Sequence, residues 1–459
     1  MTLPRSNCRA RVQRMWTPMV AALCVFCVIA CSQGDPDDSG AIADVTRVQR
    51  PSLLLITLDT TRADHLEPYG AEDVETPSLS RLAAEGIVFE HAMATSPVTA
   101  PAHASLLTGL YPPRHGVRNN STHYLPEHIP TLAEWLSETG YRTAAFVSTV
   151  ILESRYGLDQ GFEVYDDEIR SGSASRERRM TVERPAEATT DRALEWLDRL
   201  DGDEPYFLWV HYYDPHIPYS PPSPWMGNYP NRGYDGEIAY MDSQIGRLLQ
   251  HARTATKDVV VMAIGDHGES LGEHGEKTHG LLVYESTIRV PWILRLPSGP
   301  RGLRIASPVS QVDLVPTIVE LADLDRGSDV EKLDGRSLLP LLTDDTWMPD
   351  RFLFAETEVP FFAYGWSRLR SVREGTIKYI DAPVEELYDL ARDPGELSNL
   401  ASERGTEVQR LAAEVEAWAA WVKDADSTLQ IDSETTAMLQ ALGYFAGDPG
   451  RPEGEGRGN

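Results

Sequence analysis

The chain has 459 residues, of which 41% are hydrophobic and 24% are charged, and its formal net charge is −28. This length allows a large core and two lobes, at about 100–200 residues per domain, and the composition is typical of a soluble globular protein. The acidity argues against nucleic acid as a partner, because phosphate binding requires a basic surface. A well-solvated surface explains the acidity more simply.

The first 31 residues predict export from the cell. They contain all four cysteines, a basic start and a short apolar run over residues 19–30. We interpret residues 1–30 as a signal peptide, since the run is too short for a comfortable transmembrane helix. The run ends in Val28-Ile29-Ala30-Cys31, which resembles a bacterial lipobox (residues 28–31). An ordinary cleaved signal is the alternative, but only lipidation makes use of Cys31.

Lipidation of Cys31 would define where the protein works. We expect it on the periplasmic or cell-surface face of a bacterial membrane, held there only by its N-terminal lipid. Residues 31–50 are polar and rich in Asp, Gly and Ser, so they predict a flexible tether.

Strands and helices alternate over residues 51–345. Strands are expected at 52–58, from 87, and at 142–147, 206–212 and 259–264, with helices at 78–85, 131–138, 189–200 and 234–251. This alternation predicts an α/β domain with a mostly parallel sheet flanked by helices.

Beyond this domain the pattern changes. Short strands at 352–356, 368–373 and 377–380 and a helix near 406–422 predict a smaller C-terminal α+β lobe over residues 346–425. Residues 426–459 form a tail that is rich in Gly, Pro and Glu from Gly447 onward, and we expect it to be partly disordered.

Three of the predicted strands are followed by residues that commonly bind metals. Asp59 follows the first strand, Asp214 and His216 follow strand 206–212, and Asp266 and His267 follow strand 259–264. Ligands of open α/β sheets bind beyond the carboxyl ends of the strands, and parallel strands bring these ends to one edge. A lone Asp after a strand is more often a turn residue. Three such positions together predict a metal centre.

Thr99 begins a second segment of interest. Thr99 or its neighbour is suited to cap a helix that has Pro101 in its first turn and Gly109 at its end. A hydroxyl at a helix N-terminus lies in a positive field that favours an anionic ester. Taken alone, a plain capping threonine is the simpler interpretation.

The segment Thr99-x-Pro101-x-His103, followed by Leu106-Leu107-Thr108-Gly109, resembles the active-site motif of the sulfatase family. Further motifs resemble that family in the same order: 58–66, Asp214-Pro-His216, 265–269, 284–291 and 387–394. The resemblance covers about residues 51–400. It implies the fold of the alkaline phosphatase superfamily, metal-assisted ester hydrolysis, and a divalent metal bound by Asp59, Thr99, Asp266 and His267.

The chain departs from the sulfatase pattern at the nucleophile. Sulfatases convert a Cys or Ser to formylglycine, but Thr99 cannot become that aldehyde, and no cysteine follows Cys31. The motif arginine is His103, and Thr60 replaces the paired aspartate.

The metal ligand that is usually Asn is His267. A nitrogen ligand favours zinc or manganese over calcium.

A threonine nucleophile resembles the phosphodiesterase, nucleotide pyrophosphatase and phosphoglycerol transferase branches of the superfamily. Asp214, His216 and His279 follow the chain order of the second metal site in two-zinc members, so they are candidates for such a site. Alternatively, His216 and His279 only hydrogen-bond the substrate or protonate the leaving group. Lys277 lies near the position expected for a lysine. Glu269, His274 and Glu276 are explained by a solvated acidic loop.

We therefore expect a hydrolase of small anionic esters, first of all a phosphodiester or phosphoester hydrolase. The candidate catalytic residues are Thr99, His103, His216, Lys277 and His279. The alternatives are a sulfuric ester hydrolase, a phospho-headgroup transferase of the cell envelope, and a non-catalytic binding lipoprotein. The complete set of Asp59, Asp266 and His267 argues against the last, since a dead site does not need it.

Overall fold

The structure is a computed structural model that describes residues 50–169, 183–201, 204–255, 258–343, 351–421 and 428–429. The expected signal peptide with Cys31, the tether as far as residue 49, and most of the expected tail lie outside these ranges. Within them, no helix is both long enough and apolar enough to span a membrane.

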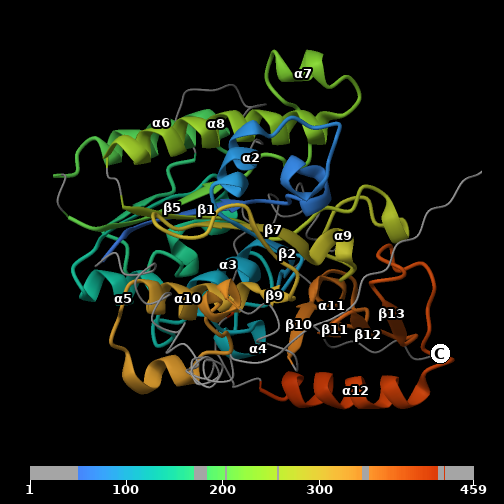
Figure 1. Ribbon diagram of the computed structural model, residues 1–459. Helices are drawn as coiled ribbons and strands as arrows, with labels where there is room; N and C mark the ends of the chain where they lie inside the picture. The colour runs from blue at the N-terminus through green and yellow to red at the C-terminus, as the bar shows by residue number, and fades with distance from the viewer. Residues whose placement is uncertain are drawn as a thin grey trace, which may run out of the picture. The chain divides into compact units, whose positions relative to one another are not determined.

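A nine-stranded sheet forms the centre of the domain, with strand order β4-β3-β5-β1-β6-β7-β2-β8 and β9 paired with β2 (Figure 1). Within the described ranges β7 runs antiparallel to both of its neighbours, and the other pairings are parallel. The mostly parallel sheet expected from the sequence is therefore confirmed. Its strands are β1 Ser52–Leu58, β2 Ile87–Met93, β3 Arg142–Phe146, β4 Val164–Asp166, β5 Tyr206–Tyr212, β6 Val259–Gly265, β7 Arg289–Arg295, β8 Leu303–Ile305 and β9 Val309–Ser310.

The central strands are apolar because both faces of the sheet are covered. Every residue of β1, β5 and β6 is buried, and successive side chains of β1 enter two different cores. Helices α2, α6 and α8 lie on one face and α3, α5 and α10 on the other (Figure 1). The helices of this domain are α2 Pro77–Ala84, α3 Thr99–Thr108, α4 Pro112–His115, α5 Leu132–Glu138, α6 Ala186–Leu197, α7 Trp225–Asn228, α8 Gly233–Ala255, α9 Glu285–Ile288 and α10 Leu314–Leu321.

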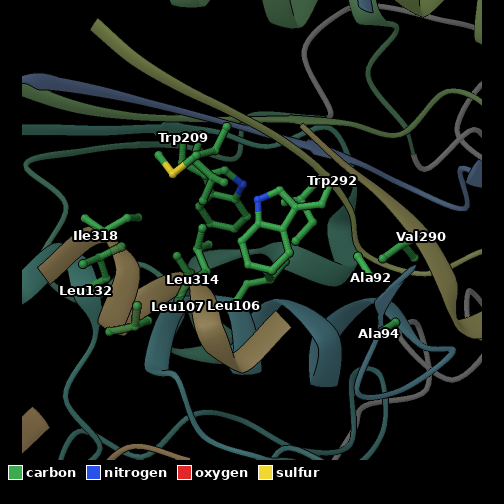
Figure 2. Close-up of a cluster of buried hydrophobic side chains, with 14 of the residues drawn as sticks. Ala92, Ala94, Leu106, Leu107, Leu132, Trp209, Val290, Trp292, Leu314 and Ile318 are labelled. Atoms are coloured by element: carbon green, nitrogen blue, oxygen red, sulfur yellow. The ribbon is translucent and has the colours of Figure 1, made fainter. Parts of the chain in front are cut away.

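Helix α3 is fixed by the core beneath the sheet. Trp209 and Trp292 point from the sheet toward Leu106 and Leu107 of α3, with Leu314 of α10 beside them (Figure 2). All ten residues of α3 are buried, and Gly109 ends the helix with φ of 69°, a conformation that glycine adopts easily. This packing holds the first turn of α3 at the edge of the sheet where β1 and β6 end.

The C-terminal lobe is an antiparallel sheet of β10 Phe352–Thr357, β11 Leu369–Glu374, β12 Ile377–Asp381 and β13 Glu386–Asp389. Helix α11 Val359–Tyr364 connects β10 to β11, and α12 Gly405–Ala419 packs against β11 and β12. Phe354 and Trp418 stack with their ring centroids 5.0 Å apart and join the helix to the sheet. The smaller lobe is thus confirmed, and β13 is a strand that the sequence did not predict.

Candidate active site

Asp59, Asp266 and His267 come together at the carboxyl edge of the sheet. Leu58 and Gly265 are partners in the parallel β1–β6 pair, so the residues that follow them emerge side by side. All three side chains are fully buried, and one ligand atom of each lies within 4.8 Å of the others. Two of the three strand ends expected to converge, those of β1 and β6, therefore contribute to this group.

This group contains oxygen atoms that lack partners. Asp59 Oδ1 and Asp266 Oδ2 are buried and accept no hydrogen bond from any described residue. Such atoms are rare, because an unpaired buried oxygen loses its hydration without compensation. His267 Nδ1 donates to the carbonyl of Gly268, so Nε2 presents its lone pair 3.6 Å from Asp266 Oδ2 and 4.0 Å from Asp59 Oδ1. Two carboxylate oxygens and an imidazole nitrogen fit a divalent metal.

The pKa values of the two carboxylates in this group also indicate that a positive charge is missing beside them. Burial, followed by repulsion from Asp266 and Glu269, raises the pKa of Asp59 well above its usual range. Burial also raises the pKa of Asp266 and lowers that of His267. Asp59 and Asp266 lie close together in a dry site, and the described ligand group includes no Lys or Arg side chain. A bound cation would therefore favour the charged forms of the two carboxylates.

Thr99 lies against this group. Its Oγ1 is 3.3 Å from His267 Nε2, which accepts the hydroxyl hydrogen. The helix begins at Thr99 itself and its N-cap is Val98, so Thr99 is not the cap. The Asn120 side-chain oxygen accepts from the amide of Ala100 at 2.8 Å and satisfies one free amide of the first turn. Thr99 is thereby held beside the candidate metal ligands at the positive end of α3.

His103 lies behind Thr99. Its Nδ1 donates to the Thr99 carbonyl at 2.8 Å, and its Nε2 accepts from the Thr57 hydroxyl at 3.1 Å. His103 and His211 also form a group of potential metal ligands with Asp266. Because both nitrogens of each ring have protein partners, we assign the two histidines to the support of the site. Burial lowers the pKa of His103 to about 4, so His103 is neutral.

His279 and His216 extend the site outward from His267. The ring centroids are 4.5 Å apart for His267 and His279, and 5.1 Å apart for His279 and His216. Burial lowers the pKa of His279, but the carboxylates around it, first of all that of Glu269 at 3.1 Å from Nδ1 and then those of Glu276 and Asp266, together raise it. His216 Nδ1 donates to the Ile217 carbonyl, and burial lowers its pKa to about 3.

Asp214, His216 and His279, the candidates for a second metal, do not form one potential metal group among the described residues. Asp214 Oδ2 accepts from the amide of Ala186 at the start of α6, and burial raises the Asp214 pKa to about 6. Neither of the two potential metal groups found in the described parts of the chain contains Asp214, His216 or His279. Lys277 is exposed on the loop that carries His279 and lies outside the buried group.

A sequence profile of the sulfatase family matches residues 51–324, which include every residue of this group. The chain belongs to the sulfatase family. A second profile, for the C-terminal region of N-sulphoglucosamine sulphohydrolase, matches residues 272–419. The match extends from the loop that carries His279 through the C-terminal lobe.

Two bacterial relatives are similar over most of the chain. An uncharacterized sulfatase, YidJ, of Escherichia coli is 26% identical over 423 residues, covering 77% of this chain and 83% of the relative. A choline-sulfatase of Rhizobium meliloti is 26% identical over 435 residues, with 77% and 82% covered. The protein is accordingly a sulfatase-family hydrolase that acts on ester bonds.

Solved structures show the same fold. Ps i-CgsB in complex with k-i-k-neocarrahexaose has a TM-score of 0.72 at 20% identity, with 86% of this chain and 98% of that chain covered. The phosphonate monoester hydrolase of Agrobacterium radiobacter has a TM-score of 0.67 at 22% identity, with 82% and 96% covered. These likenesses establish the architecture of the sulfatase family for this chain.

Three residues of this sulfatase-family site were not assigned to it from the sequence. His211 lies inside the apolar strand β5, where a histidine looks like a core residue. Asn120 lies in a loop, and no motif in the sequence relates its position to the other site residues. The sequence pattern around Glu269 is that of a solvated loop, but the residue is fully buried, and its oxygens accept from Tyr219 and pair with His279. The position of Glu269 directly after the motif Gly265-Asp266-His267-Gly268 is the sequence feature that could have assigned it to the site.

Proposed function

We propose that the protein hydrolyses phosphodiesters or related phosphoric esters with Thr99 as the nucleophile. The observation that carries this proposal is the position of the Thr99 hydroxyl, 3.3 Å from His267 Nε2 and beside two unpaired carboxylate oxygens. A divalent metal held by Asp59, Asp266, His267 and Thr99 would supply the charge that lowers the pKa of the hydroxyl and neutralises the phosphoryl oxygens. The donor set favours zinc or manganese over calcium.

The first half-reaction transfers the phosphoryl group to Thr99. The Thr99 hydroxyl first gives its proton to solvent, which a metal bound beside it would favour. A bond then forms between Thr99 Oγ1 and phosphorus while the bond from phosphorus to the leaving oxygen breaks. His279 Nδ1 lies 3.1 Å from the Glu269 carboxylate, which favours the charged form of the ring, so His279 is suited to donate a proton to the leaving oxygen. The N-terminus of α3 stabilises the negative charge of the transferred group.

The second half-reaction releases Thr99. Water attacks phosphorus, the bond to Thr99 Oγ1 breaks, and the water proton must leave. His216 is neutral, and its Nε2 has no hydrogen-bond donor or acceptor among the described residues, so it is suited to accept that proton. The opposite pKa directions of His279 and His216 thus fit an acid and a base.

A sulfuric ester hydrolase is the second candidate. It is favoured by relatives such as the choline-sulfatase at 26% identity. The chemistry of threonine disfavours it. A sulfated threonine has no second hydroxyl on the same carbon, so it cannot expel sulfate by returning to an aldehyde.

The experiment is a comparison of substrates on one preparation of purified protein. Bis-p-nitrophenyl phosphate, p-nitrophenyl phosphate, p-nitrophenyl phenylphosphonate and p-nitrophenyl sulfate are assayed with zinc, manganese and calcium in turn. We expect the diester to be cleaved faster than the sulfate ester, and zinc or manganese to support more activity than calcium. Much faster cleavage of the sulfate ester would replace our proposal with the sulfatase function.

A further inference from the structure

Gln311 is a fully buried polar residue beside the ligand turn, residues 265–268, which carries two of the candidate metal ligands. It is the first residue of the short 3-10 segment Gln311–Asp313, directly after β9. The segment is held by a hydrogen bond of 2.9 Å from the Ser310 amide to Asp313 Oδ2. Gln311 has no part in the reaction described above, although its side chain reaches the centre of the site.

The side-chain amide of Gln311 donates both of its hydrogens to the ligand turn. Nε2 donates to the carbonyl of Gly265 at 2.9 Å and to that of Asp266 at 2.6 Å. On the other side of the turn, the Asp266 amide donates to the Leu58 carbonyl at 3.2 Å. The main chain of Asp266 is therefore held between β1 and Gln311. Its position determines where the unpaired Oδ2 of Asp266 points.

This set of bonds requires a primary amide. The end of a glutamine side chain offers two N–H donors and one acceptor oxygen. Both donors of Gln311 are used by the ligand turn, and Oε1 accepts from the Thr95 amide at 3.0 Å. A carboxylate has no hydrogen to give to the two carbonyls, and an apolar side chain would leave all three partners buried without a bond.

A chain of hydrogen bonds continues from Gln311 to the helix of the nucleophile. Thr95 lies just after β2, and its hydroxyl is closer to Ser105 Oγ, at 2.8 Å, than to Gln311 Oε1, at 3.4 Å, so it donates to Ser105. Ser105 belongs to α3, whose first residue is Thr99. Burial lowers the pKa of His115 to about 3, and its Nδ1 accepts from a main-chain amide, so the neutral ring donates from Nε2 to Ser105 Oγ at 3.0 Å.

The two ends of this chain are the two parts that must meet in the reaction. The ligand turn carries Asp266 and His267, and α3 carries Thr99, whose Oγ1 is 3.3 Å from His267 Nε2. All ten residues of α3 are buried, so a movement of Ser105 shifts the helix and Thr99 with it. A displacement of reacting groups by about 1 Å can cost about 100-fold in rate.

We propose that Gln311 is a positioning residue of the reaction. It orients the ligand turn for the metal and, through Thr95 and Ser105, sets the distance between that turn and Thr99. The inference rests on the proposed ester hydrolysis at Thr99. The bonds of Gln311 go to the main chain of Asp266 and not to its carboxylate, so the effect on the metal is transmitted by the turn.

The affinity for zinc, measured by competition with a chromophoric chelator, tests the first part. Gln311→Met keeps the length of the side chain and removes its three bonds. We expect the affinity to fall by about 10–100-fold, as when a hydrogen-bond partner of a ligand is lost. Gln160→Met is the matched control, because Gln160 Nε2 also donates to two main-chain carbonyls, those of Leu125 and Gly157. This control should melt at a lower temperature but bind zinc like the wild type.

Thr95→Val tests the connection to Thr99. Valine keeps the shape of the side chain and the main-chain amide that donates to Gln311, but it cannot donate to Ser105. We expect the zinc affinity of the wild type. At saturating zinc, kcat should fall by about tenfold or more, with a smaller change in KM. The rate is measured with whichever ester the wild type cleaves fastest, so a failure of the phosphodiester proposal leaves this test in place.

Wild-type zinc affinity in folded Gln311→Met would overturn the proposal. An equal loss of affinity in Gln160→Met would do the same, because it would show a general effect of lost stability. An unchanged kcat in Thr95→Val would overturn the connection to Thr99. Gln311→Asn, which keeps an amide on a shorter side chain, takes the place of Gln311→Met if that variant does not fold. It should also bind zinc more weakly than the wild type, and equal affinity would count against the proposal.

Discussion

His211 fixes the orientation of Asp59. Its Nε2 donates to Asp59 Oδ2 at 3.1 Å, while its Nδ1 accepts from the amide of Ser148 at 3.3 Å. The amide selects the tautomer of the ring, and the ring in turn occupies one carboxylate oxygen. Asp59 Oδ1 is left as the oxygen that points into the group with Asp266 and His267. His211 therefore orients the metal ligand Asp59 by a hydrogen bond, without being assigned as a ligand itself.

Removing this support should weaken metal binding. In His211→Ala we expect the affinity for zinc to fall by about 10–100-fold, the usual loss when a hydrogen-bond partner of a ligand is removed. His211→Gln should lose less, since its amide can still donate to Asp59. Competition with a chromophoric chelator measures the affinity. His251→Gln, at a partly exposed histidine paired with Asp198, is the control and should bind zinc normally. Unchanged affinity in folded His211→Ala would contradict the assigned support.

Asp266→Asn should abolish metal binding and activity together. The Asp266 Oδ1 accepts from the amides of Thr60 and His267, so an asparagine oxygen can keep both bonds, but its amino group would face the metal position. Wild-type protein should gain thermal stability when zinc is added after chelation, because a ligand that binds only the folded state stabilises it. The variant should show no such gain in a melting experiment. A full metal stoichiometry in Asp266→Asn would mean that the ligand set is different.

The ligand group could be predicted because it depends on sheet topology. β1, β5 and β6 are continuous apolar runs, the pattern of strands covered on both faces, and residues after neighbouring parallel strands must emerge together. That rule brings Asp59, Asp266 and His267 to one edge, although it selects Asp214 and His216 after β5 as well. The sulfatase-like motif added Thr99, whose distance from His267 depends on how α3 packs under the sheet.

The remaining assignments depend on side-chain directions, which spacing does not fix. Asp214 follows β5 at the same edge, but its carboxylate turns to the N-terminus of α6. Sequence patterns also do not predict which residues of a loop are buried. Glu269 and Lys277 both lie on the polar segment after β6, and one is fully buried while the other is exposed. The sequence motif predicts that His103 acts on the substrate, whereas its bonds to Thr57 and Thr99 favour a supporting role.

Glu276 should make stability depend on pH. Burial raises its pKa to about 7 in the folded protein, so the folded state binds a proton more tightly than the unfolded state does. Its contribution to stability is complete below the unfolded pKa and is lost as the pH rises through about 7. Glu276→Gln cannot ionise. Relative to the wild type, it should gain up to roughly 3 kcal/mol between pH 5 and pH 8, from the size of the shift.

Urea unfolding of both proteins across this pH range measures that difference. Glu403→Gln, at an exposed position, is the matched control and should give no trend of this kind. A constant difference between wild type and Glu276→Gln from pH 5 to pH 8 would show that Glu276 is not held in a dry environment.

The N-terminal prediction concerns residues outside the described part of the chain. Small residues precede Cys31 as in a lipobox, so we propose that Cys31 carries the lipid that anchors the protein. Cys31→Ser should move the protein from the membrane fraction to the soluble exported fraction. Cys27→Ser, four residues earlier in the same apolar run, should leave it on the membrane. Membrane fractionation of Cys31→Ser like the wild type would place the anchor elsewhere.

The last prediction is that Thr99 carries the phosphoryl group between the two half-reactions. The Thr99 hydroxyl hydrogen-bonds to His267 at the N-terminus of α3, where an anionic group is stabilised, so a phosphothreonine would remain in the same field. Acid quenching during turnover of a diester, followed by mass spectrometry, should find on Thr99 a phosphoryl group that still carries the retained alcohol of the diester, and no aldehyde there. Thr99→Ser should retain some turnover and become phosphorylated, because serine keeps the hydroxyl. Thr99→Ala should show neither, and its loss of activity should exceed that of Thr99→Ser. Turnover by Thr99→Ala at the wild-type rate would mean that water attacks the ester directly.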